Sequence, residues 1–152
     1  SEARLWYQWY FNTEQGRVGL EVNRRDIIRH LWETWAPEWK YTDKAFDRSA
    51  ASFDNPDFVE IVIHSYRHRH MNAPGEDRYA EVEHQLARLP PILVPSIVLR
   101  GAATGLGKPA EDPSGDREKF NNLVARRIVE GAGHDLPVQR PDEVSAALLE
   151  LL

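Results

Sequence analysis

The chain has 152 residues, of which 41% are hydrophobic and 28% are charged, and its formal net charge is −5 at pH 7. These values are typical of one globular domain, not of a disordered chain, and the acidic balance offers no electrostatic footprint for nucleic acid. The sequence has no cysteine, which excludes disulfides, and no signal-peptide pattern or long apolar run, so we expect a cytoplasmic protein without a membrane span.

The first part of the chain, residues 1–91, predicts five helices. Residues 3–12 are aromatic on nearly every side, so we expect this segment to be buried on most sides. Asn23 and Thr42 have the chemistry of N-caps and predict the starts of the second and third helices. The pair Asn55-Pro56 predicts the start of the fourth helix, with proline in the first helical position.

The fifth helix is predicted after a loop at residues 73–75, and four of its apolar side chains are expected to face inward: Tyr79, Val82, Leu86 and Leu89. Pro90-Pro91 ends the helical part. Beyond it, an aliphatic run predicts a buried strand that begins near Ser96, and a short helix through Phe120 is expected after a polar loop.

A second strand over residues 125–129 and a final helix over 141–152 complete the pattern. This strand-helix-strand-helix order predicts a parallel pair, and both strands have the composition of strands buried on two faces. Two strands do not form a stable sheet by themselves, so we expect the chain to be part of a larger fold.

One histidine stands out because of its place after the second predicted strand. His134 follows Gly131-Ala132-Gly133, a glycine-rich turn that comes directly after that strand. Histidine titrates near neutrality, and a loop at the end of a strand exposes a side chain while the scaffold holds it. The pattern predicts a proton shuttle, and the alternative is a turn histidine that bonds to nearby backbone.

The cluster His64, His68 and His70 invites a metal site, but no acidic residue lies among these histidines at ligand spacing, and Arg67 and Arg69 oppose a cation. A solvated basic helix end is the better interpretation, and we expect no metal. The clustered tryptophans, among them Trp32 and Trp35, form either core or the wall of an apolar pocket.

Four segments together carry a family resemblance. Residues 6–11 (WYQWYF) look like the opening of an epoxide hydrolase cap, and residues 63–67 (IHSYR) resemble the signature on a later cap helix. Residues 94–101 look like the strand that leads to the catalytic acid, and residues 131–134 (GAGH) resemble the catalytic-histidine loop. The chain thus resembles the α/β-hydrolase family, in its epoxide hydrolase-like branch, over the cap and the C-terminal part.

The resemblance implies an α/β fold in which a helical cap (residues 1–91) precedes the C-terminal strand-helix-strand-helix portion of the hydrolase core (residues 92–152). It implies a nucleophile that forms an ester with the substrate, and His134 as the general base that activates water to cleave it. Tyr7 and Tyr66 match the cap tyrosines that donate hydrogen bonds to the epoxide oxygen.

The same resemblance implies a small apolar substrate, which would be an epoxide, a halide or an ester. The pocket for it is predicted to include Trp35, Trp32 and His64. No cofactor is expected, because this chemistry needs only side chains and water.

Two features depart from the family pattern. The nucleophile elbow, Gly-x-Ser-x-Gly or Gly-x-Asp-x-Gly, does not occur, so we expect a companion chain or an N-terminal half to supply the nucleophile. The acid position reads Gly101-Ala102-Ala103-Thr104 in place of Gly-x-x-Asp, and threonine cannot hold negative charge. The acid then comes from an earlier strand outside this chain, or from Asp112 or Asp116, or the site is degenerate.

The chain alone is therefore predicted to be inactive. The alternative function is a non-catalytic binding or interaction module, or a truncated remnant of a hydrolase; among enzymes, a dehalogenase or an esterase is the nearest alternative. An exposed sheet edge needs cover, so we expect a partner surface, and an oligomer is one form that it could take.

Overall fold

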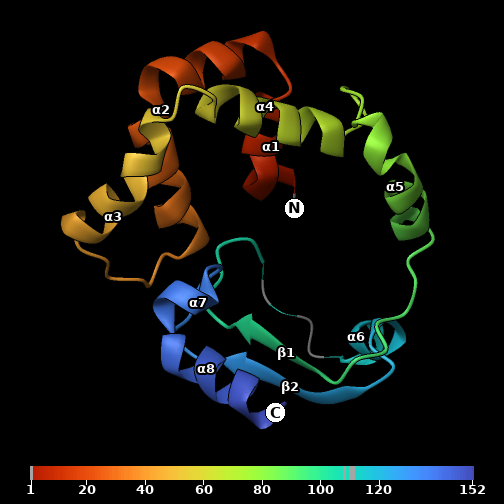
Figure 1. The fold of residues 1–152 in the computed structure, drawn as a ribbon. Coiled ribbons are helices and arrows are strands. Elements are labelled where there is room, and N and C mark those ends of the chain that lie inside the picture. The colour runs from red at the N-terminus through yellow and green to blue at the C-terminus, as the bar shows by residue number, and fades with distance from the viewer. Residues whose placement is uncertain (1, 108, 110–111) are drawn as a thin grey trace. The chain divides into compact units, whose positions relative to one another are not determined.

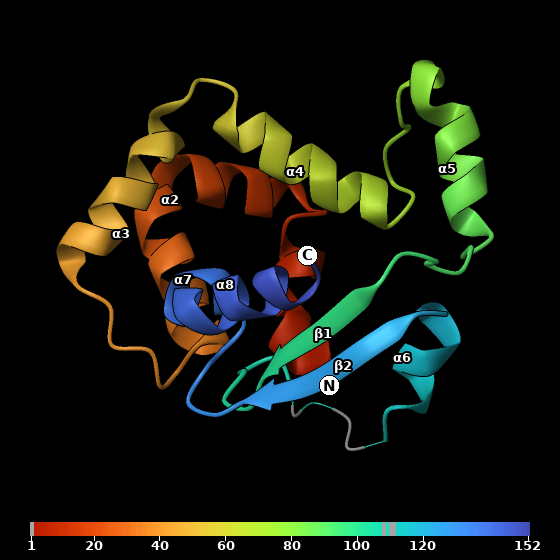
Figure 2. The same ribbon diagram turned by 60° about the horizontal axis from the view of Figure 1, so that its bottom comes forward.

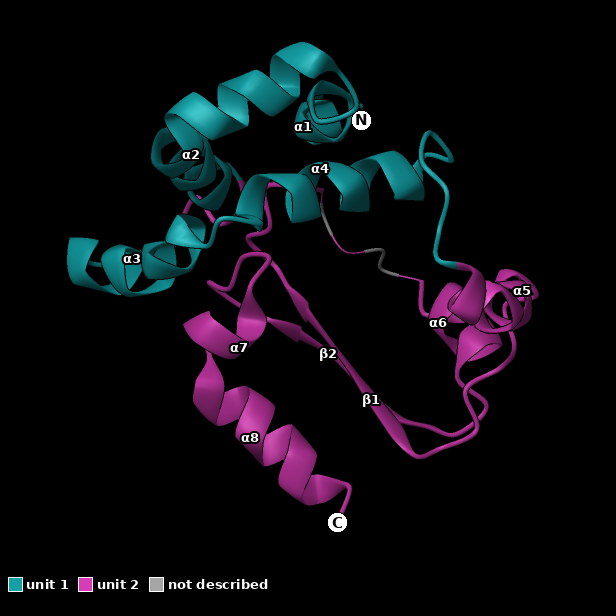
Figure 3. Ribbon diagram, turned by 45° about the horizontal axis from the view of Figure 1, so that its top comes forward, with its two compact units in different colours: residues 1–34, 40–76 teal, residues 35–39, 77–152 magenta. Residues whose placement is uncertain are grey.

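A computed structural model describes residues 2–107, 109 and 112–152 of the chain (Figure 1). The chain divides into two compact units, which are described separately here (Figure 3). Unit 1 comprises Ser1–Thr34 and Lys40–Glu76, and unit 2 comprises Trp35–Trp39 and Asp77–Leu152. The division into a cap (residues 1–91) and a part of the hydrolase core (residues 92–152) is a division by function, and it stays a prediction.

Unit 1 is helical. It contains the 3-10 helix Glu2–Leu5, α1 (Trp6–Tyr10), α2 (Glu14–Trp35, whose last residue belongs to unit 2), α3 (Asp43–Ala50), the 3-10 helix Ala51–Asp54 and α4 (Phe58–Arg69). The predicted N-cap at Asn23 lies inside α2, which begins at Glu14; the helix kinks there, because the backbone of Asn23 leaves helical geometry (φ −122°, ψ 31°). Thr42 caps α3 as predicted: its Oγ1 accepts a hydrogen bond from the Ala45 N–H at 3.2 Å.

The core of unit 1 is an aromatic cluster. Phe46, Ala50 and Phe53 are buried, and four partly buried side chains pack against them: Ile28, Trp32, Tyr41 and Phe58. Trp32 meets the ring of Phe46 edge-on, with the ring centroids 5.3 Å apart. Aromatic pairs in this geometry add to the free energy gained from burial alone, so the cluster holds α2, α3 and α4 together.

Two expectations for unit 1 were wrong in detail. Helix α4 begins at Phe58 and not at Asn55-Pro56, because the Asn55 side chain accepts the N–H of Asp57 at 2.9 Å and turns the chain first. In the aromatic segment 3–12, Tyr7 is buried, whereas 52% of Trp9 is exposed. Within the five-residue helix α1, Tyr7 is therefore packed, whereas Trp9 faces solvent.

Unit 2 combines helices with a small parallel sheet (Figures 1 and 2). It contains the 3-10 helix Asp77–Tyr79, α5 (Ala80–Ala87), β1 (Ser96–Gly101), α6 (Ser114–Lys119), β2 (Leu123–Val129), α7 (Leu136–Gln139) and α8 (Pro141–Glu150). The predicted strand start at Ser96 and the parallel pairing are both confirmed: Ile97 pairs with Ala125 and Gly101 with Val129. The ends of β1 and β2 therefore lie at the same edge of the sheet.

The burial predicted for unit 2 was wrong. The apolar side chains expected to face inward from α5 are exposed; Leu86 is 59% exposed and Leu89 85%. The strands are not buried on two faces: β1 is half-buried along most of its length, and in β2 Val124 is 49% exposed and Ile128 40%. Within the described part of the chain, no helix combines the length and apolar character needed to cross a membrane.

Candidate functional site

His134 lies on the loop that joins β2 to α7. The chain turns at Gly131, whose positive φ of 64° suits glycine, and the His134 side chain is exposed. The His134 N–H donates to the carbonyl oxygen of Trp35 at 3.3 Å, and the Trp35 ring meets the imidazole edge-on with centroids 5.6 Å apart. Backbone and ring contacts with Trp35 thus hold His134 at the C-terminal edge of the sheet.

The loop after β1 packs directly against the His134 loop. Gly101 closes β1, and a Cβ added there would lie 2.1 Å from the carbonyl oxygen of Gly133, so only glycine fits. The Ala103 N–H donates to the carbonyl oxygen of Ala132 at 2.8 Å. The loop after β1, which carries Thr104, is therefore held next to the histidine loop.

A pocket of about 380 Å³ opens at this edge of the sheet, and His134 and Thr104 both line it, together with Arg100 and Leu136. The Thr104 hydroxyl accepts the N–H of Leu106 at 3.3 Å. No Asp or Glu is among the described residues that line this pocket. A second pocket of about 370 Å³ also reaches His134, and its walls are apolar side chains of β1 and α8, such as Leu99 and Leu148.

Asp112 and Asp116, the predicted substitutes for the acid, have other partners. Asp112 accepts hydrogen bonds from the N–H and the hydroxyl of Ser114, which lower the pKa of its carboxyl. Asp116 is buried; Arg100 Nη2 donates to its Oδ1 at 2.5 Å and Arg126 Nε to its Oδ2 at 2.8 Å. The hydrogen bonds from Arg100 and then Arg126 lower the pKa of Asp116. Neither carboxyl is among the described residues that line the His134 pocket.

In unit 1, the structure brings Tyr7 of α1 and Tyr66 of α4 together across 59 positions of sequence. Their rings meet edge-on with centroids 5.6 Å apart at an interplanar angle of 83°. Tyr7 is buried, and Gln8 Nε2 donates to its hydroxyl at 3.3 Å. Tyr66 is half-buried; burial, and then the charge of Tyr7, raise the pKa of its phenol. Tyr66 thus keeps its proton and can donate a hydrogen bond at neutral pH.

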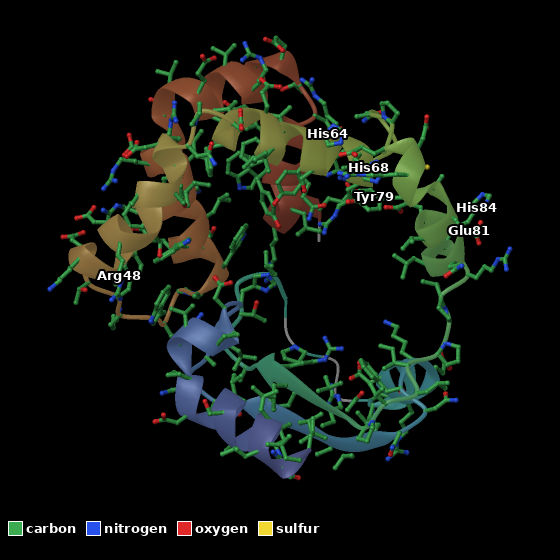
Figure 4. The ribbon with its side chains drawn as sticks, viewed as in Figure 1. Arg48, His64, His68, Tyr79, Glu81 and His84 are labelled. Atoms are coloured by element: carbon green, nitrogen blue, oxygen red, sulfur yellow. The ribbon has the colours of Figure 1, made fainter. Side chains whose placement is uncertain are left out.

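The residues predicted to line the pocket have separate environments. Trp35 lies beside His134, whereas Trp32 packs in the aromatic core of unit 1. His64 is exposed on α4, where its ring stacks on that of His68, with centroids 5.9 Å apart (Figure 4). Among the described residues, no group of three or more His, Cys, Asp or Glu side chains is placed to hold a metal ion.

Sequence reasoning missed two groups that contact the histidine loop. One is the main-chain carbonyl of Trp35, which has no side-chain signature. The other is Gln139, whose Oε1 accepts the Gly133 N–H at 2.7 Å. A glutamine soon after a histidine loop has no distinctive pattern by itself, so only the folded loop identifies it.

No model of a known protein family matches the chain, and no curated protein is significantly similar to it. A solved structure does match: that of a "putative epoxide hydrolase" from Klebsiella pneumoniae subsp. pneumoniae, with 38% sequence identity over 99% of this chain and a TM-score of 0.92. The chain covers 49% of that protein, about half its length. In sequence and in fold, the chain is thus epoxide hydrolase-like over almost all of its residues.

Proposed function

We propose that this chain forms the cap and the base-bearing part of an α/β-hydrolase that opens epoxides. The observation that carries the proposal is the placement of His134: it is exposed at the common edge of two parallel strands, and it shares a pocket with the family's acid position at Thr104. In open α/β sheets, ligands bind outside the carboxyl ends of the strands. The likeness to the K. pneumoniae protein supports the hydrolase class.

In the first step of the proposed reaction, a carboxylate from outside this chain attacks one carbon of the epoxide. A C–O bond forms as the ring C–O bond breaks, and the ring oxygen develops negative charge. The phenols of Tyr7 and Tyr66 donate hydrogen bonds to that oxygen, and one of them supplies its proton. Their paired, sheltered placement in unit 1 supports this role.

In the second step, His134 takes a proton from water, and the oxygen of that water attacks the ester carbonyl. The ester C–O bond breaks, the diol leaves and the carboxylate is regenerated, and the proton held by His134 returns to the phenolate that the first step left. No cofactor enters either step. The identity of the nucleophile separates the close alternatives, because an aspartate suits an epoxide or a halide and a serine suits an ester.

A second function is supported by Thr104. A neutral side chain at the acid position cannot compensate an imidazolium, and the described lining of the pocket offers no carboxylate in its place. This combination supports a binding module, or a remnant of a hydrolase, as the second candidate function. The two functions differ in one measurable property, which is the dependence of turnover on His134.

The test is a chimera in which this chain replaces the matching half of the K. pneumoniae protein. It is assayed with an epoxide that the unmodified K. pneumoniae protein hydrolyses. The proposal expects diol formation by the chimera, and it expects His134→Gln to stop turnover while the ester accumulates as a mass increase on the intact protein. A folded chimera that forms neither diol nor ester favours the binding module. The chain by itself is expected to form no diol, and turnover by it that depends on His134 would contradict the need for an outside nucleophile.

A further inference from the structure

The His134 loop is held at two consecutive backbone amides, and neither bond belongs to the ladder of the sheet. The Gly133 N–H donates to Oε1 of Gln139 at 2.7 Å, and the His134 N–H donates to the carbonyl oxygen of Trp35 at 3.3 Å. The first bond is the shorter, and it is the one made by a side chain. Gln139 is the last residue of α7, so the turn of helix after His134 reaches back to the residue before it.

Gly133 has little freedom to find another acceptor. It is buried, and a Cβ added to it would lie 2.5 Å from the Cβ of Ala36 and 3.1 Å from the carbonyl oxygen of Trp35. A buried N–H without a partner is unfavourable, so the loop keeps this conformation only while an acceptor is present. In this structure, the side chain of Gln139 supplies that acceptor.

The nitrogen end of the Gln139 side-chain amide differs from the oxygen end. Its Nε2 is buried and has no hydrogen-bond partner in the described part of the chain. An amide at the surface would satisfy both ends with water, whereas this one loses the hydration of its donor end and keeps only the bond to Gly133. The hydrogen bonding of this side chain therefore consists of its oxygen accepting the Gly133 N–H.

We propose that Gln139 is the positioning residue of His134: by accepting the Gly133 N–H, it fixes the backbone from which the imidazole projects into the pocket. The proposal rests on the proposed function in one respect, because it takes His134 to be the base. It assigns Gln139 no contact with the substrate. It requires an acceptor at position 139, and it makes the amide nitrogen dispensable.

Three variants of the full 152-residue chain test whether Gln139 holds the histidine loop. Gln139→Leu keeps a similar volume and removes the acceptor, and Gln139→Glu keeps an acceptor oxygen. Gln85→Leu is the matched control, because Gln85 is exposed on α5 and donates to Glu81. The readout is amide hydrogen exchange of Gly133 by NMR, with the amides of the β1–β2 ladder as the measure of folding.

Gln139→Leu is expected to speed exchange at Gly133 about tenfold, in line with the loss of one hydrogen bond, and to shift the ring signals of His134. Gln139→Glu and Gln85→Leu are expected to leave both unchanged. The proposal is overturned if Gly133 exchange in Gln139→Leu equals that of the unmodified chain while the ladder stays protected. The proposal is also overturned if the Gly133 amide loses its protection from exchange in Gln139→Glu. This second comparison is decisive even if Gln139→Leu unfolds.

The catalytic half is tested in the chimera by single-turnover kinetics. Gln139→Leu is expected to leave ester formation unchanged and to slow ester hydrolysis by up to about 100-fold, which a misplacement of a catalytic group by about 1 Å can cost. Gln139→Glu is expected to restore the rate. Equal slowing of both steps overturns the positioning role. If His134→Gln itself leaves hydrolysis unchanged, the proposed function fails, and the exchange data still decide whether Gln139 holds the loop.

Discussion

The ring of Tyr7 abuts that of Tyr66 edge-on, with centroids 5.6 Å apart, and this contact joins α1 to α4 within unit 1. The ring of Phe11 also contacts both tyrosines, with its centroid 5.3 Å from that of Tyr66 and 6.5 Å from that of Tyr7. The two phenols therefore share one apolar environment. Burial raises the pKa of the Tyr66 phenol, which therefore keeps its proton at neutral pH.

Replacing Tyr66 by phenylalanine removes the hydroxyl and leaves the aromatic contacts in place. In the chimera, we expect Tyr66→Phe to slow ester formation by about 100-fold, the lower range for loss of a general acid, without slowing ester hydrolysis. Rapid-quench mass spectrometry of the ester separates the two steps. Tyr79→Phe, at an exposed tyrosine, is the control and should leave both rates unchanged. If Tyr66→Phe and Tyr79→Phe changed the rate of ester formation equally, Tyr66 would have no part in the mechanism.

The Thr104 position offers a gain-of-function prediction. Thr104→Asp places a carboxylate in the pocket that His134 lines, at the position that the proposed function assigns to the acid. We expect this change to speed ester hydrolysis in the chimera by about tenfold or more, because the carboxylate stabilises the imidazolium that forms. The gain should vanish in the His134→Gln background. A gain that persists there would have a different origin from the histidine.

Asp116 is expected to stabilise the fold through its two arginine partners. Its lowered pKa means that folding favours the carboxylate, so its contribution is present at neutral pH and is lost as the pH falls below the ordinary value of 3.8. Asp116→Asn should cost roughly 2 kcal/mol at pH 7, a modest value because Arg100 is partly exposed.

Urea unfolding at pH 7 and pH 3 measures this contribution. The difference in free energy of unfolding between the unmodified chain and Asp116→Asn should be smaller at pH 3 than at pH 7. Asp54→Asn, at an exposed carboxylate, should change stability little at either pH. A constant difference between Asp116→Asn and the unmodified chain at the two pH values would show that the arginine contacts are not the cause.

Two glycines of unit 2 should respond to alanine with opposite signs. Gly133→Ala forces a methyl group to within 2.5 Å of Ala36, and we expect a loss of about 1–3 kcal/mol from overpacking. Gly115→Ala meets nothing within 4 Å in α6, and we expect a gain of about 0.5–1 kcal/mol from the better helix propensity of alanine. Thermal unfolding of both variants measures the two signs, and a stabilised Gly133→Ala would disprove the close packing.

Local chemistry in the sequence by itself determined several elements. Thr42 caps α3 because its hydroxyl reaches an amide three residues away, and Asn23 interrupts α2 through a local preference for non-helical geometry. The start of β1 at Ser96 follows in the same way from Pro95, which has no N–H for a ladder, and from the aliphatic run after it. Each of these features depends on residues that are neighbours in the chain.

Only the tertiary structure decided the rest. The pairing of Tyr7 with Tyr66 and the contact of Trp35 with His134 join residues far apart in sequence, and no local pattern specifies which partners meet. The exposure of Leu86 on α5 was mispredicted because an apolar periodicity marks the face that needs cover, while burial depends on what packs there. Gln139 was missed for a related reason: its role comes from the path of the backbone, which brings its oxygen to the buried amide of Gly133.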